Sequence, residues 1–226
     1  MRPRSSYQGF TRKEILVTFA VILVLGTCLA SYLYSLMPTK QKEMSAVVGA
    51  RSIHTMLTTW AQDHDQKFPT ARQFSNEAFR ELFKARLLDE GGEKLFSIEG
   101  DAWHKNSASG AGPDNIIGPA PDFPQALQRG ECAYFYVTGL DTASASYLPL
   151  LGNGFTESPG VYSNNKSHKG GVFRGEKAAY ITVGGSAKAV DLSSDLRILG
   201  NKDDKSIDIF SKAWGTNPDD IKNPEG

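Results

Sequence analysis

The chain has 226 residues, and its 25 basic and 25 acidic side chains leave a formal net charge of +0 at pH 7. This balance provides no global electrostatic case for a nucleic-acid-binding protein, so nucleic acid is not expected among its partners. The length favours one modest globular domain in addition to an apolar segment near the start. The two cysteines, Cys28 and Cys132, fall in separate segments, and we expect no disulfide between them.

A long apolar run follows a short basic stretch at the start of the chain. Residues 15–37 carry no charged side chain, and as a helix they would extend ~34 Å at about 1.5 Å per residue, against a hydrocarbon thickness of ~30 Å. Arg2, Arg4, Arg12 and Lys13 precede the run without an intervening acid. The sequence therefore predicts a membrane-spanning helix with a cytoplasmic N-terminus.

Gly9 and Phe10 stand just before this run, and Glu14 lies at its edge. Secretory signal peptides are cleaved after their apolar stretch, whereas a cut between Gly9 and Phe10 would keep the stretch in the mature chain. A carboxylate in a membrane helix costs roughly 3 kcal/mol by insertion scales, so Glu14 indicates a partner for its charge. Glu14 can also stabilise the positive end of the helix by roughly 0.3–1 kcal/mol, and the two roles are compatible.

The combination of Gly9, Phe10, Glu14 and the apolar run resembles the processing and assembly signal of type IV pilins and type II secretion pseudopilins. The resemblance implies cleavage after Gly9 and N-methylation of Phe10 by a prepilin peptidase. It also implies that the Glu14 carboxylate attracts the new amine of Phe10, on its own chain or a neighbouring one. Such a protein is a structural subunit of a pilus or a secretion pseudopilus and not an enzyme.

The same resemblance implies partners and a location. The partners are other pilin or pseudopilin subunits, an inner-membrane assembly platform and membrane lipid. The location is the bacterial inner membrane, with the N-terminus cytoplasmic and the C-terminal domain periplasmic. A second class of function stays open, in which a single-pass envelope protein carries an exported domain that binds a ligand or catalyses an unrecognised reaction.

The predicted fold class is α+β, in which a long N-terminal membrane-spanning helix continues into a small globular domain with an antiparallel sheet, as in pilins. The predicted segments are a leader peptide over 1–9, a long helix over 10–66 (membrane span 15–37, exported part 39–66), a globular domain over 67–215 and a flexible tail over 216–226.

Apolar residues recur at helical spacing in two groups along the exported part of the long helix. The first group is Met44, Val47 and Val48, and the second is Ile53, Met56, Leu57 and Trp60. At about 100° per residue the two groups face nearly opposite directions. We expect the second group to pack against the globular domain and the first to face neighbouring helices in an assembly.

The globular domain is predicted to mix helices and strands. The predicted elements are a helix over 70–88 that ends before Gly91 and Gly92, a long surface loop over 106–124, strands over 132–137, 178–183 and 187–192, and a short helix over 206–214. Gly184-Gly185-Ser186 separates the last two strands and predicts a hairpin. Cys132 is expected to be a small buried residue rather than a reactive thiol.

Candidate ligands for chemistry are few. Asp63, His64 and Asp65 end the long helix, but adjacent carboxylates without a spaced ligand set make a poor metal site, and we expect them to be solvated. His168-Lys169-Gly170-Gly171 resembles a feature of the same pseudopilin-like group, although Gly184-Gly185-Ser186 replaces the Asp-Gly-His turn of that group. No catalytic, cofactor or metal residues are therefore predicted.

Overall fold

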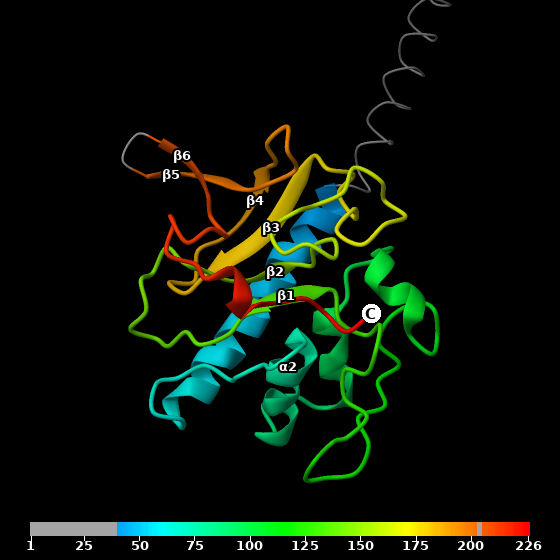
Figure 1. Ribbon diagram of the computed structural model, residues 1–226. Coiled ribbons are helices and arrows are strands. Elements are labelled where there is room, and N and C mark those ends of the chain that lie inside the picture. The colour runs from blue at the N-terminus through cyan, green and yellow to red at the C-terminus, as the bar shows by residue number, and fades with distance from the viewer. Residues whose placement is uncertain (1–39, 203–204) are drawn as a thin grey trace, which may run out of the picture. The chain divides into compact units, whose positions relative to one another are not determined.

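A computed structural model describes residues 40–202 and 205–226, and Lys42–Gly226 pack together as one unit (Figure 1). The strands are β1 (Tyr134–Val137), β2 (Pro149–Asn153), β3 (Lys177–Thr182), β4 (Ala187–Asp191), β5 (Leu199–Lys202), β6 (Lys205–Asp208) and β7 (Ile221–Lys222). The helical segments are residues 40–62, α2 (Ser75–Lys84) and three short 3-10 helices, η1 (Glu90–Phe96), η2 (Ala102–Asn106) and η3 (Pro218–Asp220).

The main sheet has five antiparallel strands in the order β4-β3-β2-β1-β7, and its strands β1, β2 and β3 are buried on both faces. Successive side chains of a strand point to opposite faces. In β1, Tyr134 and Tyr136 enter one hydrophobic cluster, whereas Phe135 and Val137 enter a second cluster. Helix 40–62 and α2 contribute to the first cluster, and the segment after β6 contributes Phe210 to the second. The strand therefore lacks the polar alternation of a half-exposed sheet.

Helix 40–62 lies along one face of the main sheet, and the first hydrophobic cluster fills the space between them (Figure 1). Five of its side chains at helical spacing are completely buried: Ala46, Ala50, Ile53, Leu57 and Ala61. Gly49 allows a close approach, because a Cβ there would lie 2.5 Å from the Tyr134 hydroxyl. That hydroxyl donates a hydrogen bond to the Ala46 carbonyl at 3.0 Å, which joins the helix to β1.

The predicted fold class requires correction. Among residues 40–202 and 205–226, no helix is both long and apolar enough to cross a membrane. Helix 40–62 is amphipathic, because the side opposite its buried stripe carries mostly charged, amide and hydroxyl side chains, together with the exposed Met44 and Val48. The described chain is thus an amphipathic helix packed on an antiparallel sheet, and the predicted membrane span over 15–37 lies outside the described residues. From Lys42 onward the helix belongs to the same unit as the sheet.

The predicted hairpin is confirmed. β3 and β4 pair antiparallel, with Ile181 opposite Ala187 beside the turn. Gly185 has a φ of +80°, which suits glycine in a tight hairpin turn. The strand predicted over 132–137 is observed as β1, and Cys132 is fully buried as expected.

The helix predicted over 70–88 is shorter than expected, because α2 ends at Lys84. Arg86 adopts a left-handed φ of 57°, and the Leu87 amide bonds back to the Leu82 carbonyl at 3.0 Å. A non-glycine residue therefore closes the helix in the way glycine usually does. Gly91 and Gly92, which were expected to stop it, instead lie within η1.

The predictions for the C-terminal region are wrong in two places. The segment expected to be a helix over 206–214 begins as strand β6, which pairs with β5, and then turns at Asp208, whose carboxylate accepts a hydrogen bond from the Phe210 amide at 2.9 Å. The expected flexible tail over 216–226 contains η3 and β7, and Ile221 is 5% exposed as β7 pairs with β1. Pairing with a distant strand overrides the local helical spacing in the first case and the polar composition in the second.

Candidate functional site

The predicted processing and assembly residues, Gly9, Phe10 and Glu14, lie outside the described residues. Three features of the described residues bear on function: the outer face of helix 40–62, an open pocket beside this helix, and the buried titratable groups of the domain.

The outer face of helix 40–62 exposes two large apolar side chains. Met44 is 71% exposed and Val48 is 53% exposed, as predicted for the first apolar group. Val47, which was placed in the same group, is instead partly buried against the core. Ile53 and Leu57 of the second group are fully buried, which confirms that this group packs on the domain.

Polar side chains also lie on this outer face, and two of them are already hydrogen-bonded within the helix. The hydroxyls of Thr55 and Thr59 both donate to backbone carbonyls one turn earlier, at 3.0 Å. A hydroxyl that is already bonded within its own helix loses little when another surface covers it, since desolvation is costly only for unpaired groups. The outer face defined by Met44, Val48, Thr55 and Thr59 is therefore suited to contact with another helix.

Two other residues tie this helix to the sheet. His54 lies with its Nε2 2.9 Å from the Val183 carbonyl oxygen, and Arg51 donates a long 3.4 Å hydrogen bond to the Ala187 carbonyl. Both contacts are to the ends of the β3–β4 hairpin. His54 thus has a packing role.

The acidic end of the helix shows a structural arrangement. The His64 ring stacks on Trp60 with ring centroids 3.5 Å apart, and its Nδ1 lies 2.8 Å from the Trp60 carbonyl oxygen. Asp63 and Asp65 are exposed, and within the described residues they do not join His64 in a group with metal-binding spacing. Asp65 and Gln66 have left-handed φ values of 53° and 62°, which end the helix.

The His168-Lys169-Gly170-Gly171 segment is also explained by packing. A Cβ on Gly171 would lie 1.9 Å from the Asn165 carbonyl oxygen, and Gly170 has a φ of +73°. The Lys169 ammonium sits 4.2 Å from the ring centre of Trp103. The two glycines therefore permit a tight loop that lies against the Phe155 backbone and places Lys169 over Trp103, and His168 is exposed.

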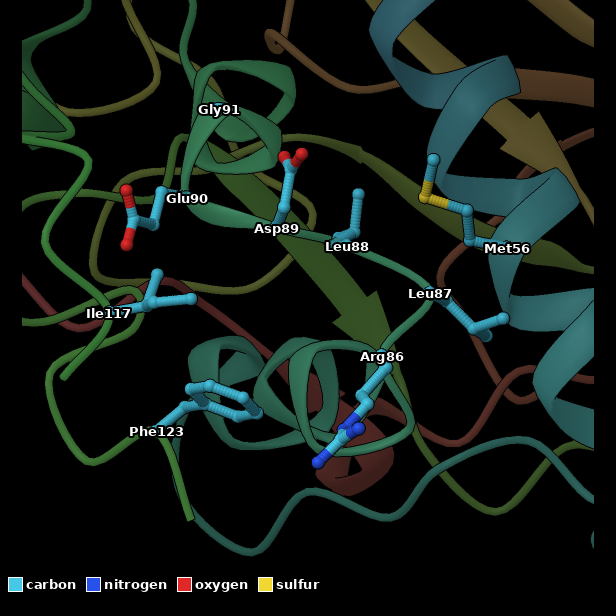
Figure 2. A pocket seen from close by; sticks show the side chains of 9 residues that line it. All are labelled: Met56, Arg86, Leu87, Leu88, Asp89, Glu90, Gly91, Ile117 and Phe123. Atoms are coloured by element: carbon cyan, nitrogen blue, oxygen red, sulfur yellow. The ribbon is translucent and has the colours of Figure 1, made fainter. Parts of the chain in front are cut away.

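An open pocket of about 700 Å³ lies beside helix 40–62 (Figure 2). Its lining residues are Met56, Arg86, Leu87, Leu88, Asp89, Glu90, Gly91, Ile117 and Phe123. In Figure 2, Met56 reaches it from the helix, and Ile117 and Phe123 come from the irregular segment on the other side. Its charged side chains are exposed and, within the described chain, belong to no ion pair. The pocket is thus an open depression of mixed polarity with solvated charged side chains, rather than a converging set of catalytic groups.

The titratable groups with shifted pKa values are not among the residues that line this pocket. Glu93 and Glu131 are buried, and their side-chain oxygens approach that of Asp114. Burial, followed by the nearby charges of Glu93 and Asp114, raises the pKa of Glu131 to about 7. Burial also raises the pKa of Glu93, although the backbone amide of Leu127 opposes the shift. Sequence reasoning missed this group because its members come from three separate segments.

Two further buried groups have clear structural roles. Asp101 caps η2 by accepting a hydrogen bond from the Trp103 amide at 3.1 Å, and burial raises its pKa to about 7. His104 lies with its Nδ1 2.8 Å from the Gly130 carbonyl oxygen, and burial lowers its pKa. His104 therefore joins η2 to the segment before β1.

Comparisons of the chain with protein-family models, curated proteins and solved structures gave no match. The resemblance to type IV pilins and pseudopilins accordingly rests on the sequence around Gly9, Phe10 and Glu14.

Proposed function

We propose that this chain is a structural subunit of a type IV pilus or a type II secretion pseudopilus, and that it acts by assembly rather than by catalysis. The proposal is supported in the structure by one observation. Helix 40–62 buries one stripe on its own domain and leaves Met44 and Val48 exposed on the other side, in its first described turns. Exposed apolar side chains on a helix that is already docked are available for contact with another subunit.

In this proposal, a prepilin peptidase cleaves after Gly9 and methylates the new amine of Phe10. The Glu14 carboxylate then neutralises that amine on its own chain or on a neighbour, which removes the cost of an unpaired charge in a low-dielectric environment. The partners are other pilin or pseudopilin subunits, an inner-membrane assembly platform and membrane lipid. The proposed location of the described domain is the periplasmic side of the bacterial inner membrane, with the N-terminus cytoplasmic.

The test is mass spectrometry of the N-terminal peptide of the native protein, because its mass reports cleavage and methylation together. We expect a mature N-terminus at methylated Phe10, and we expect Gly9→Val to retain the leader. Glu14→Val should be cleaved and reach the membrane fraction yet fail to assemble. Asp63→Asn, which removes an exposed carboxylate further along the chain that belongs to no ion pair among the described residues, is the matched control and should assemble normally. An uncleaved leader on the native protein, or normal assembly of Glu14→Val, would refute the proposal.

A further inference from the structure

The outer face of helix 40–62 carries one positive charge beside its exposed apolar side chains. Along residues 44–62, Arg51 is the only acidic or basic residue other than His54, and it is exposed. Arg51 follows Met44 by seven residues, so at about 100° per residue the two lie within roughly 20° of each other around the helix. Its guanidinium donates one long hydrogen bond, of 3.4 Å, to a carbonyl oxygen at the start of β4. The other N–H groups of this side chain are left for a partner beside Met44 and Val48.

The open pocket beside the helix has the opposite net charge. Two acidic side chains and one basic side chain line it, namely Asp89, Glu90 and Arg86. Figure 2 shows Asp89 and Glu90 along one edge of the pocket and Arg86 on the opposite edge, where Phe123 also lies. Asp89 and Glu90 are exposed and, in the part of the chain that the structure describes, belong to no ion pair. The pocket thus places two available carboxylates at the border of an apolar surface.

We propose that this pocket receives the outer face of a second copy of the chain. In the contact, Met44 and Val48 of one copy cover the apolar lining of the other, and Arg51 pairs with Asp89 or Glu90. The fork of an arginine matches a carboxylate in geometry as well as in charge. Complementary charges fix the register of an interface and favour the encounter of the correct surfaces. The inference rests on the proposed assembly function and names the surface that accepts the outer face.

The two surfaces are different parts of one subunit. They share no residue, so a subunit can use its outer face toward one neighbour and its pocket toward another. Met56, which lines the pocket, lies 12 residues after Met44, or ~18 Å along the helix at about 1.5 Å per residue. An interface between two different surfaces continues from copy to copy unless its rotation closes a ring. Such a contact builds a filament rather than a two-fold dimer.

The experiment reverses the charges of the full chain on each surface and measures filament yield by sedimentation and electron microscopy. Arg51→Glu places a carboxylate opposite Asp89 and Glu90, and we expect it to lower the yield about tenfold or more, because like charges at an interface are costly. In the Arg51→Glu background, either Asp89→Arg or Glu90→Arg should restore most of the yield, because the ion pair forms again in the reverse sense. The unfolding midpoint in urea should stay unchanged, because all three side chains are exposed.

Two substitutions outside both surfaces serve as controls. Lys166→Glu reverses another exposed cation and should assemble normally. Asp195→Arg reverses an exposed acid that does not line the pocket, and it should leave the Arg51→Glu chain defective.

The inference is overturned if Arg51→Glu assembles normally, or if Asp195→Arg restores assembly as well as the pocket reversals do. It is also overturned if neither pocket reversal restores assembly, which would indicate that the pocket binds a different partner. These results leave the proposed function standing as long as the unchanged chain is cleaved after Gly9 and forms filaments. An unchanged chain that forms no filaments overturns both.

Discussion

Replacing Met44 or Val48 with lysine should separate assembly from folding. Both side chains are mostly exposed, at 71% and 53%, so the loss of burial within the subunit is small. Lysine has about the same helix propensity as methionine and a better one than valine. We therefore expect each substitution to change the free energy of unfolding by no more than ~0.5 kcal/mol, the usual range for surface positions.

The effect on assembly should be much larger. If this face is covered by a neighbouring helix, each lysine places an ammonium group without a partner in an apolar contact, which costs several kcal/mol. A loss of about 3 kcal/mol lowers an association constant more than 100-fold. Val47 is less suitable for this test, because it is partly buried against the core and a charge there would also disturb the subunit.

The reference for a true folding defect is Leu57→Ala on the opposite side of the same helix. Leu57 is completely buried, and its truncation should cost about 2–5 kcal/mol. Unfolding of the purified chains in urea measures stability, and filament yield by sedimentation and electron microscopy measures assembly. The reasoning fails if Met44→Lys and Val48→Lys assemble as well as the unchanged chain, or if they destabilise the subunit as much as Leu57→Ala does.

Other predictions concern single contacts. Burial raises the pKa of Asp101 from 3.8 to about 7, so the folded state binds the Asp101 proton more tightly than the unfolded state does. The stabilisation from this protonated carboxyl group is therefore present below about pH 4 and is lost as the pH rises to about 7. Asp101→Asn keeps the capping oxygen and should reduce this loss of stability, which urea unfolding measures between about pH 4 and 8. If the free energy of unfolding falls with pH as steeply in Asp101→Asn as in the unchanged chain, Asp101 is not the group responsible. Gly171→Ala should destabilise the domain by at least ~2 kcal/mol in the same assay, because the added Cβ would collide with the Asn165 carbonyl oxygen. An unfolding midpoint equal to that of the unchanged chain would contradict this loop conformation. Ile221→Ala should lower the free energy of unfolding by about 2–5 kcal/mol, because Ile221 is buried where β7 forms the edge of the sheet. A change near zero would indicate that residues 216–226 form a flexible tail after all.

Several features could be predicted because they depend on neighbouring residues. The buried positions of Ile53 and Leu57 repeat with the helical period, and the tight turn at Gly184-Gly185 uses residues that tolerate a left-handed backbone. Both features were recognised in the sequence for this reason. The helical spacing over 206–214 failed because β6 gains hydrogen bonds from β5, which a local pattern does not reveal.

The sequence by itself determined an amphipathic helix whose buried stripe packs on the domain and a hairpin near residue 185, and it carries the residues around Gly9, Phe10 and Glu14 on which the proposed function rests. Only the tertiary structure decided that Val47 turns toward the core, that β7 completes the sheet beside β1, and that Glu93, Asp114 and Glu131 share one site. The physical reason is the distance along the chain over which each interaction acts. Helical period and turn chemistry act over a few residues, whereas sheet pairing and the meeting of charges depend on segments that only the folded core brings together.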